Sequence, residues 1–154
     1  MAIGQGDVAL TPIGINTAIA ALAQGGKLCF PKIYDTERKC IDLGIEENVI
    51  DTVREGMRLA CSSGGTGYTF FDFKEKYGVN VACKTGTAET NDIDNTTHAW
   101  FTVFAPAEDK SEKKSESSKK PEIVLTVMVE KGGEGSKVAG PIAREIMDYW
   151  FGSK

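Results

Sequence analysis

The chain has 154 residues, the size of one globular domain, and a formal net charge of −4 at pH 7. Hydrophobic residues make up 41% and charged residues 26%, values typical of soluble proteins that bury a core without metals or disulfides. No basic stripe favours nucleic acid as a partner, and no apolar run approaches the roughly 20 residues of a membrane-spanning helix. No signal peptide is visible, so we expect the chain to be soluble as it stands.

The first predicted helix covers about residues 12–24. Thr11 is a suitable N-cap, and Pro12 fits the first helical turn. Apolar residues then recur with the helical period until Gly25-Gly26, where glycine ends the helix. The following stretch, 27–45, shows no clear period, and we assign no regular structure to it.

A second helix is predicted over about residues 46–61, where apolar residues again fall on one face. Glu46 and Glu47 suit its start because acidic side chains stabilise the positive end of the helix dipole. The glycine- and serine-rich stretch 62–67 ends it.

The hydrophobic period then changes to that of strands, predicted over about 79–87, 98–105 and 122–130. Between the last two, residues 106–121 are dense in Lys and Glu and predict a long, flexible charged loop. A last helix is predicted over about 137–151. Helices and strands are grouped rather than alternating, which favours an α+β fold with an antiparallel sheet and flanking helices.

The four cysteines, at 29, 40, 61 and 83, form no C-x-x-C pair, and His98 has no cysteine near it in sequence. This spacing argues against a zinc site. We interpret the cysteines as free buried thiols and leave a Cys29–Cys40 bridge open, because sequence alone cannot establish pairing.

One motif carries chemistry: Lys84-Thr85-Gly86-Thr87, at the end of the strand predicted over 79–87. A lysine can orient a substrate carboxylate and assist proton movement, and threonine offers a hydroxyl donor. Gly86 lets a substrate backbone lie close to the strand, and the Thr87 N–H can stabilise an oxyanion. K-T-G, together with S-x-x-K and a second serine motif, is the signature of serine β-lactamases and penicillin-binding proteins.

Nearly the whole chain resembles class B penicillin-binding proteins, in the order of that family. The matching segments are Ile3-Gly4-Gln5-Gly6-Asp7, Leu10-Thr11-Pro12-Ile13, Gly25-Gly26-Lys27, Val53 with Gly56 and Met57, Gly65-Thr66-Gly67, Val81 to Glu89, His98-Ala99-Trp100-Phe101, Phe104-Ala105-Pro106, Pro121 to Glu130, and Pro141-Ile142-Ala143. Cys83 departs from the family, which has glycine before the lysine; strand alternation points Cys83 away from the Lys84 face.

The resemblance implies that residues 1–154 are the C-terminal part of one transpeptidase domain with an incomplete fold. It implies a D,D-transpeptidase that cross-links peptidoglycan stem peptides through an acyl-enzyme and binds β-lactams, with no cofactor or metal. Lys84 would be catalytic, and Thr85, Gly86 and Thr87 would bind substrate. The parent protein would act on the outer face of the bacterial cell membrane.

The family mechanism also needs a serine in S-x-x-K and a second serine in S-x-N, both upstream of the K-T-G strand. No S-x-N occurs in the chain. The strings Ser111 to Lys114 and Ser117 to Lys120 match S-x-x-K, but both lie downstream in the charged loop, where nothing fixes a base beside the serine. We therefore expect the chain alone to be inactive, with the N-terminal half of the domain missing.

Other interpretations remain open. The chain could be a non-catalytic interaction module or the complementing half of a split transpeptidase, and Met1 directly before the Ile3-Gly4-Gln5-Gly6 segment suits a shortened gene or a cut at this point. A β-lactamase or carboxypeptidase relative is a third possibility. Because only three strands are predicted, an unpaired edge at 79–87 or 123–130 could also cause self-association.

Three further features receive structural interpretations. His98 fits a packed or surface histidine better than a catalytic one. The aromatic residues Tyr68, Phe70, Phe71 and Phe73 fit a loop docked on the core better than a ligand-binding patch. The glycine-rich stretch 132–136 lacks the lysine and the spacing of a phosphate-binding loop and predicts a turn.

Overall fold

The computed structural model describes residues 9–90, 93–108 and 120–153. Its helices are α1 (Pro12–Ala23), α2 (Glu47–Ala60), the 3-10 helix η1 (Tyr68–Phe70), α3 (Phe73–Tyr77) and α4 (Ala139–Gly152). Its strands are β1 (Lys27–Cys29), β2 (Cys40–Asp42), β3 (Ala82–Glu89), β4 (Thr97–Ala105) and β5 (Ile123–Val129).

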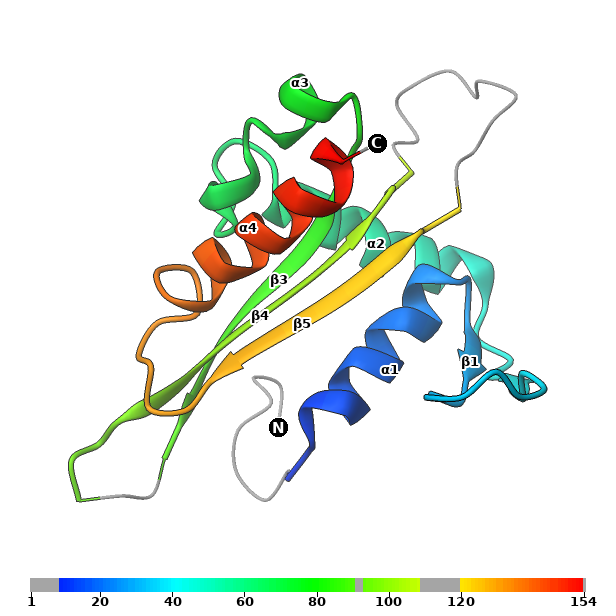
Figure 1. Ribbon diagram of the computed structural model, residues 1–154, viewed down its shortest axis with the longest axis horizontal. Helices are drawn as coiled ribbons and strands as arrows, with labels where there is room; N and C mark the ends of the chain where they lie inside the picture. Colours follow the sequence, from blue (N-terminus) through cyan, green and yellow to red (C-terminus); the bar gives the residue numbers. More distant parts are fainter. Residues whose placement is uncertain (1–8, 91–92, 109–119, 154) are drawn as a thin grey trace.

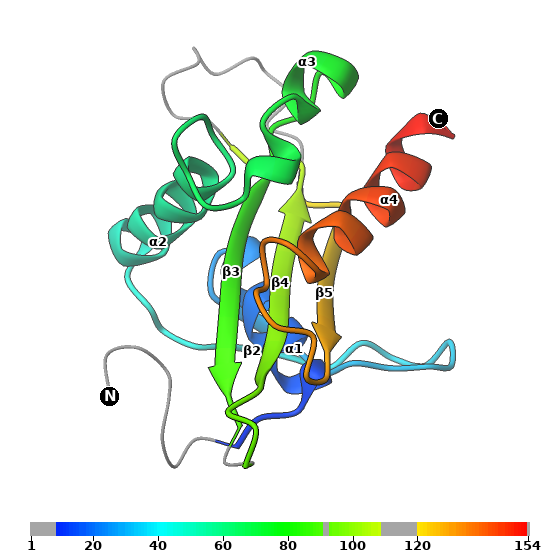
Figure 2. The ribbon, with the colours of Figure 1, turned by 90° about the vertical axis from the view of Figure 1, so that its left-hand side faces the viewer.

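Strands β3, β4 and β5 form one antiparallel sheet in that order. Helix α4 covers one face of the sheet and α1 covers the opposite face, while α2 lies beside β3 (Figures 1 and 2). The expectation of an α+β fold with an antiparallel sheet and flanking helices is therefore confirmed.

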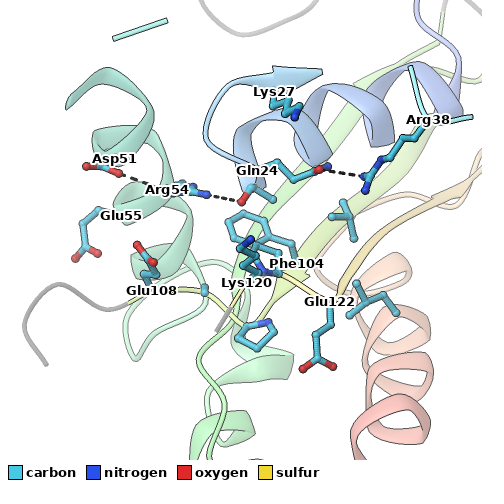
Figure 3. Close-up of a pocket in the computed structure, with 16 residues that line it drawn as sticks. Gln24, Lys27, Arg38, Asp51, Arg54, Glu55, Phe104, Glu108, Lys120 and Glu122 are labelled. Atoms are coloured by element: carbon cyan, nitrogen blue, oxygen red, sulfur yellow. Dashed lines mark hydrogen bonds and ion pairs between the residues drawn. The ribbon is translucent and has the colours of Figure 1, made fainter. Parts of the chain in front are cut away.

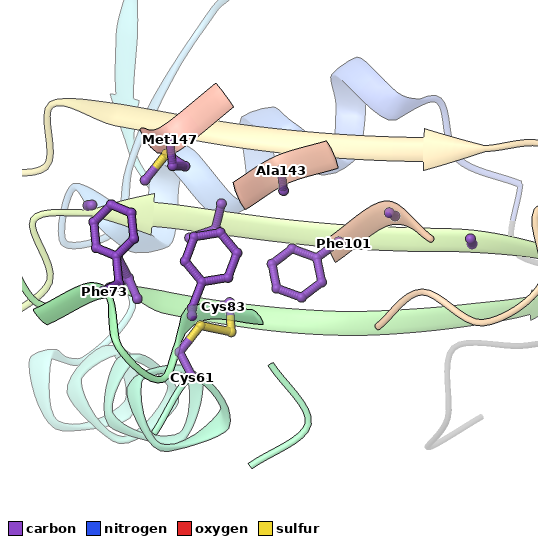
Figure 4. Packing of buried hydrophobic residues seen from close by; sticks show 12 residues of the cluster. Cys61, Phe73, Cys83, Phe101, Ala143 and Met147 are labelled. Atoms are coloured by element: carbon purple, nitrogen blue, oxygen red, sulfur yellow. A yellow bond between two sulfur atoms is a disulfide. The ribbon is translucent and has the colours of Figure 1, made fainter. Parts of the chain in front are cut away.

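Strand β4 is the centre of the core because it is buried on both faces. Its alternate residues Phe101 and Val103 pack under α4 with Phe70, Phe73 and Met147. Figure 4 labels Phe73, Phe101 and Met147 of this cluster. On the other face, a smaller apolar cluster joins β4 to α1 and α2 through Ala23, Met57, Ala82, Phe104 and Ala107.

The longer helices and strands differ by a few residues at most from the ranges expected from sequence. Two features had no prediction: the short antiparallel pair β1–β2 inside 27–45, and the helices η1 and α3. The charged stretch 106–121 is described only at its ends; most of it, with the serines of both S-x-x-K strings, lies outside the described residues, as does the Ile3 to Asp7 segment.

The expectation of free cysteine thiols is wrong, because all four cysteines form disulfides. Cys29 and Cys40 are directly opposite each other in the β1–β2 pair, with their Cα atoms 4.0 Å apart. Cys61 follows α2 and Cys83 lies in β3, and these Cα atoms are 5.7 Å apart. Each pair is brought together by the packing of two different elements, so the spacing of the cysteines in the sequence does not reveal the pairing.

Among the described residues, none of the helices has both the length and the hydropathy needed to cross a lipid bilayer.

Candidate active site

The Lys84 to Thr87 motif lies in the middle of β3, and its residues alternate between the two faces of the sheet. Lys84 is paired with Thr102 and Gly86 with Trp100, so these four residues share the face on which α1 packs. The side chains of Thr85 and Thr87 lie on the opposite face, the side of α4. The motif therefore presents its lysine and its two hydroxyls to different sides of one strand.

A pocket of about 270 Å³ lies beside the motif and is lined by all four of its residues. Its other walls are mainly apolar: Ile15, Ile19, Ala88, Trp100, Phe101, Thr102 and Thr126. The Lys84 side chain is exposed here, and its Nζ donates a hydrogen bond to the Thr85 carbonyl oxygen at 2.7 Å. The lysine thus lies at the border of a space that described side chains do not fill.

The two threonines are each held by a turn on the α4 side. The hydroxyl oxygens of Thr85 and Thr66 are 3.1 Å apart. The Gly135 N–H donates to the Thr87 hydroxyl oxygen at 3.4 Å. Thr66 and Gly135 lie in the connecting turns expected from sequence, but no sequence pattern indicates that they contact the motif.

Gly86 is closely approached by Trp100 of β4 and by Gly135 of the turn before α4. A Cβ on Gly86 would lie 3.0 Å from the Cβ of Trp100, and one on Gly135 would lie 2.3 Å from the Gly86 carbonyl oxygen. Gly135 is therefore required for close backbone approach, whereas a side chain at Gly86 would press on Trp100. No described strand pairs with the second edge of β3, which leaves that edge able to receive an extended peptide.

A larger pocket, of about 610 Å³, lies around the end of β4 and does not include the motif (Figure 3). Charged side chains of both signs line it, but its two arginines are used within the protein. Arg54 donates to the carbonyl oxygens of Leu22 and Ala23, and Arg38 donates to Gln24 at 3.1 Å. The smaller pocket has the motif lysine at its border and the unpaired edge of β3 beside it, which makes it the better candidate site.

The features given structural interpretations have structural contacts. His98 accepts a hydrogen bond from the Lys131 N–H through Nδ1 at 3.1 Å, and 132–136 forms the turn before α4. Phe70 and Phe73 are buried in the core, with the Arg144 guanidinium 5.8 and 5.3 Å from their ring centres, whereas Tyr68 and Phe71 are exposed.

Over the described part of the chain, no cluster of three or more His, Cys, Asp or Glu side chains could hold a metal ion.

Residues 1–148 match the family model described as penicillin binding protein transpeptidase domain, so the chain belongs to that family. This confirms the resemblance found in the sequence. The chain is 28% identical to the peptidoglycan D,D-transpeptidase MrdA of Haemophilus influenzae, and the match covers 99% of this chain and 25% of that protein.

Solved structures agree in fold. Penicillin-binding protein A of Mycobacterium tuberculosis is 29% identical with a TM-score of 0.71, and the match covers 95% of this chain and 35% of that one. PBP2 of Helicobacter pylori, solved in complex with MreC, is 29% identical with a TM-score of 0.73, covering 99% of this chain and 27% of that one. The chain thus spans between a quarter and about a third of the length of these three relatives.

Proposed function

We propose that this chain supplies the lysine side of the acylation cleft of a peptidoglycan D,D-transpeptidase. The observation that carries the proposal is the position of Lys84 to Thr87: an edge strand in the described structure, beside a pocket that all four residues line. Membership of the transpeptidase family supports it.

In this proposal Lys84 is the catalytic residue of the chain. Its positive charge supports the proton network of the attacking serine and attracts the carboxylate of the substrate. Thr85 and Thr87 bind the substrate through their hydroxyls, and the Thr87 N–H helps to stabilise the oxyanion. Gly86, which has no Cβ, lets the peptide lie against the strand.

The reaction we propose is acyl transfer between stem peptides. A serine outside this chain attacks the penultimate D-alanyl carbonyl, the terminal D-alanine leaves, and an amine of a second stem peptide then takes the acyl group. β-Lactams would enter the same cleft because they mimic D-alanyl-D-alanine. The structure of the related M. tuberculosis protein as an imipenem acyl-enzyme complex supports this.

We infer that the chain alone is inactive. It contains no S-x-N, and its two S-x-x-K strings lie downstream of the K-T-G strand. Loss of the serine nucleophile in a hydrolase of another fold lowers turnover by about 10⁶, or roughly 8 kcal/mol of barrier.

The proposed partner is therefore the rest of a transpeptidase domain, with its serine-bearing segment in the pocket beside Lys84. The apolar Ile15, Ile19 and Trp100 give that pocket walls suited to a packed helix. We place the site outside the cell membrane, and the two disulfides support this because such bonds persist in oxidising compartments.

The test is to graft the chain into the H. influenzae relative in place of the segment it matches, and to measure covalent labelling by penicillin. We expect the graft to be labelled, and Lys84→Ala to lower the acylation rate by about 10²-fold or more. Lys27→Ala, in β1, is the matched control and should leave the rate unchanged. A folded graft without labelling would contradict the function, and a penicillin mass shift on the isolated chain would contradict its inactivity.

A further inference from the structure

The Cys61–Cys83 disulfide lies directly behind the candidate site. Cys83 immediately precedes Lys84 in β3, but its side chain points to the opposite face, into the core under α4. Cys61 is the C-terminal cap of α2. Both are buried, with 0% of Cys83 and 4% of Cys61 exposed. The close-up in Figure 4 shows the bridge between them. The bridge therefore ties the end of α2 to the residue before the lysine.

Besides its pairing with β4 and the hydrogen bonds of Thr85 and Thr87, the segment Lys84 to Thr87 has one open edge and one open face. Within the described residues β3 pairs only with β4, so one edge of β3 has no ladder of hydrogen bonds. On its α1 face the strand borders the 270 Å³ pocket instead of packed side chains. An edge strand with an open pocket on one face is expected to open locally more readily than a strand such as β4, which is paired on both sides.

The end of the turn 62–67 packs directly against this bridge. A Cβ on Gly67 would lie 2.4 Å from the Cys83 sulfur, and the Gly67 N–H donates to the Ala60 carbonyl oxygen at 2.8 Å. The neighbouring Thr66 hydroxyl then reaches Thr85 at 3.1 Å. The bridge, the turn and the Thr66–Thr85 contact thus form one continuous support on the face opposite Lys84.

We propose that Cys61 and Cys83 are positioning residues of the candidate site: their disulfide holds the segment Lys84 to Thr87 in place from behind. The consequence for catalysis rests on the proposed function, whereas the positioning itself is a property of the isolated chain. The second disulfide joins β1 to β2, outside the three-stranded sheet that carries the motif, and has no such role.

The test is hydrogen–deuterium exchange, resolved by residue, on the oxidised chain and on two double variants. In Cys61→Ala/Cys83→Ala we expect the β4-paired amides of Lys84 to Thr87 to exchange about tenfold faster relative to β5 amides of the same molecule. The matched control, Cys29→Ala/Cys40→Ala, should leave that ratio unchanged. Equal acceleration of β3 and β5, or a raised ratio in both variants, would overturn the proposal.

A second measurement covers the case in which the first variant fails to fold. A dithiol reductant gives two electrons and two protons to a disulfide; the S–S bond breaks, two cysteine thiols form, and the dithiol closes to a cyclic disulfide. Because the Cys29–Cys40 pair is only partly buried, it should be reduced first. We expect the exchange ratio of β3 to β5 amides to rise only when the Cys61–Cys83 bond is reduced. A rise when Cys29–Cys40 is reduced, or unfolding of the whole sheet when Cys61–Cys83 is reduced, would refute the positioning role.

Neither measurement uses a substrate, so the two proposals can fail separately. If the exchange ratio rises in Cys61→Ala/Cys83→Ala but the graft is not labelled by penicillin, the positioning role stands and the proposed transpeptidase function is rejected. If the graft is labelled but the exchange ratio is unchanged, the transpeptidase function stands and the positioning role is rejected.

Discussion

The two disulfides differ in what surrounds them. Cys29–Cys40 joins the short strands β1 and β2, next to a stretch in which Ile33 is 94% and Tyr34 is 79% exposed. Cys61–Cys83 lies in the core under α4, one residue before Lys84. The first closes a surface hairpin, and the second joins a helix to the strand that carries the candidate site.

Loop-closure entropy predicts nearly the same stabilisation of the protein by the two disulfides. Their cysteines are 11 and 22 residues apart, and the loop-closure model gives each about 3 kcal/mol because the dependence on length is logarithmic. A difference in their effects must therefore come from the folded state. A surface hairpin can detach while the sheet stays folded, whereas the end of α2 cannot leave β3 without exposing the core.

The largest expected effect on stability comes from removing the buried Cys61–Cys83 bridge, with removal of Cys29–Cys40 as the comparison. Cys61→Ala/Cys83→Ala should lower the free energy of unfolding by about 3–5 kcal/mol, because loop entropy and buried packing are lost together. Cys29→Ala/Cys40→Ala should lower it by only about 1 kcal/mol, because the native state also regains the freedom of the hairpin. Urea denaturation of both variants measures this, and equal losses would show that only loop closure matters.

A smaller effect is expected from Gly67, which lies against the buried bridge. In Gly67→Ala the new methyl group would lie 2.4 Å from the Cys83 sulfur, so the turn must shift, and overpacking of this kind costs about 1–3 kcal/mol.

Gly56→Ala is the matched control within α2. A Cβ there meets nothing within 4 Å, and alanine in an exposed helical position should raise the free energy of unfolding by about 0.5–1 kcal/mol. Thermal unfolding of both variants tests the pair. A neutral Gly67→Ala would mean that the turn is not confined by the bridge.

The fold was largely predictable because its signals are local. The helical period of apolar residues after Thr11 and the apolar run Ile123 to Val129 can each be recognised within a single segment, and the structure has α1 and β5 there. The β1–β2 pair was not predictable, because each strand has only three residues and much of the intervening chain is exposed.

The candidate site was predictable only in its motif. Lys84 to Thr87 follow one another in sequence, whereas Cys61, Thr66 and Gly135 reach them only through the packing of α2 and the turn before α4. One usable signal existed: strand alternation points Cys83 away from the Lys84 face and so toward the core. A cysteine that points into the core can form a disulfide only with another buried cysteine, which here is Cys61.

The smallest expected effect concerns a non-covalent restraint on the segment that follows the buried bridge. Arg144 of α4 donates hydrogen bonds to the Asp72 carboxylate and, at 2.6 Å, to the Thr69 carbonyl oxygen, which holds residues 69–72 against α4. The hydrogen bond from Arg144 lowers the pKa of Asp72 below its ordinary value of 3.8. The Asp72 side chain is 61% exposed, so solvent screening limits the pair to less than about 1 kcal/mol.

Because the folded-state pKa of Asp72 is the lower one, its contribution to stability is present above pH 3.8 and is lost as the pH falls through that lowered pKa. Asp72→Asn should therefore be less stable than the wild-type chain near neutral pH, and the two should converge in acid. Urea denaturation from pH 7 down to about pH 2 measures this. Asp35→Asn, in the exposed stretch before β2, is the control, and a difference for Asp72→Asn that persists in acid would exclude its charge as the cause. Since this ion pair is worth less than the buried bridge, its loss should loosen the segment after Gly67 while Lys84 keeps its place.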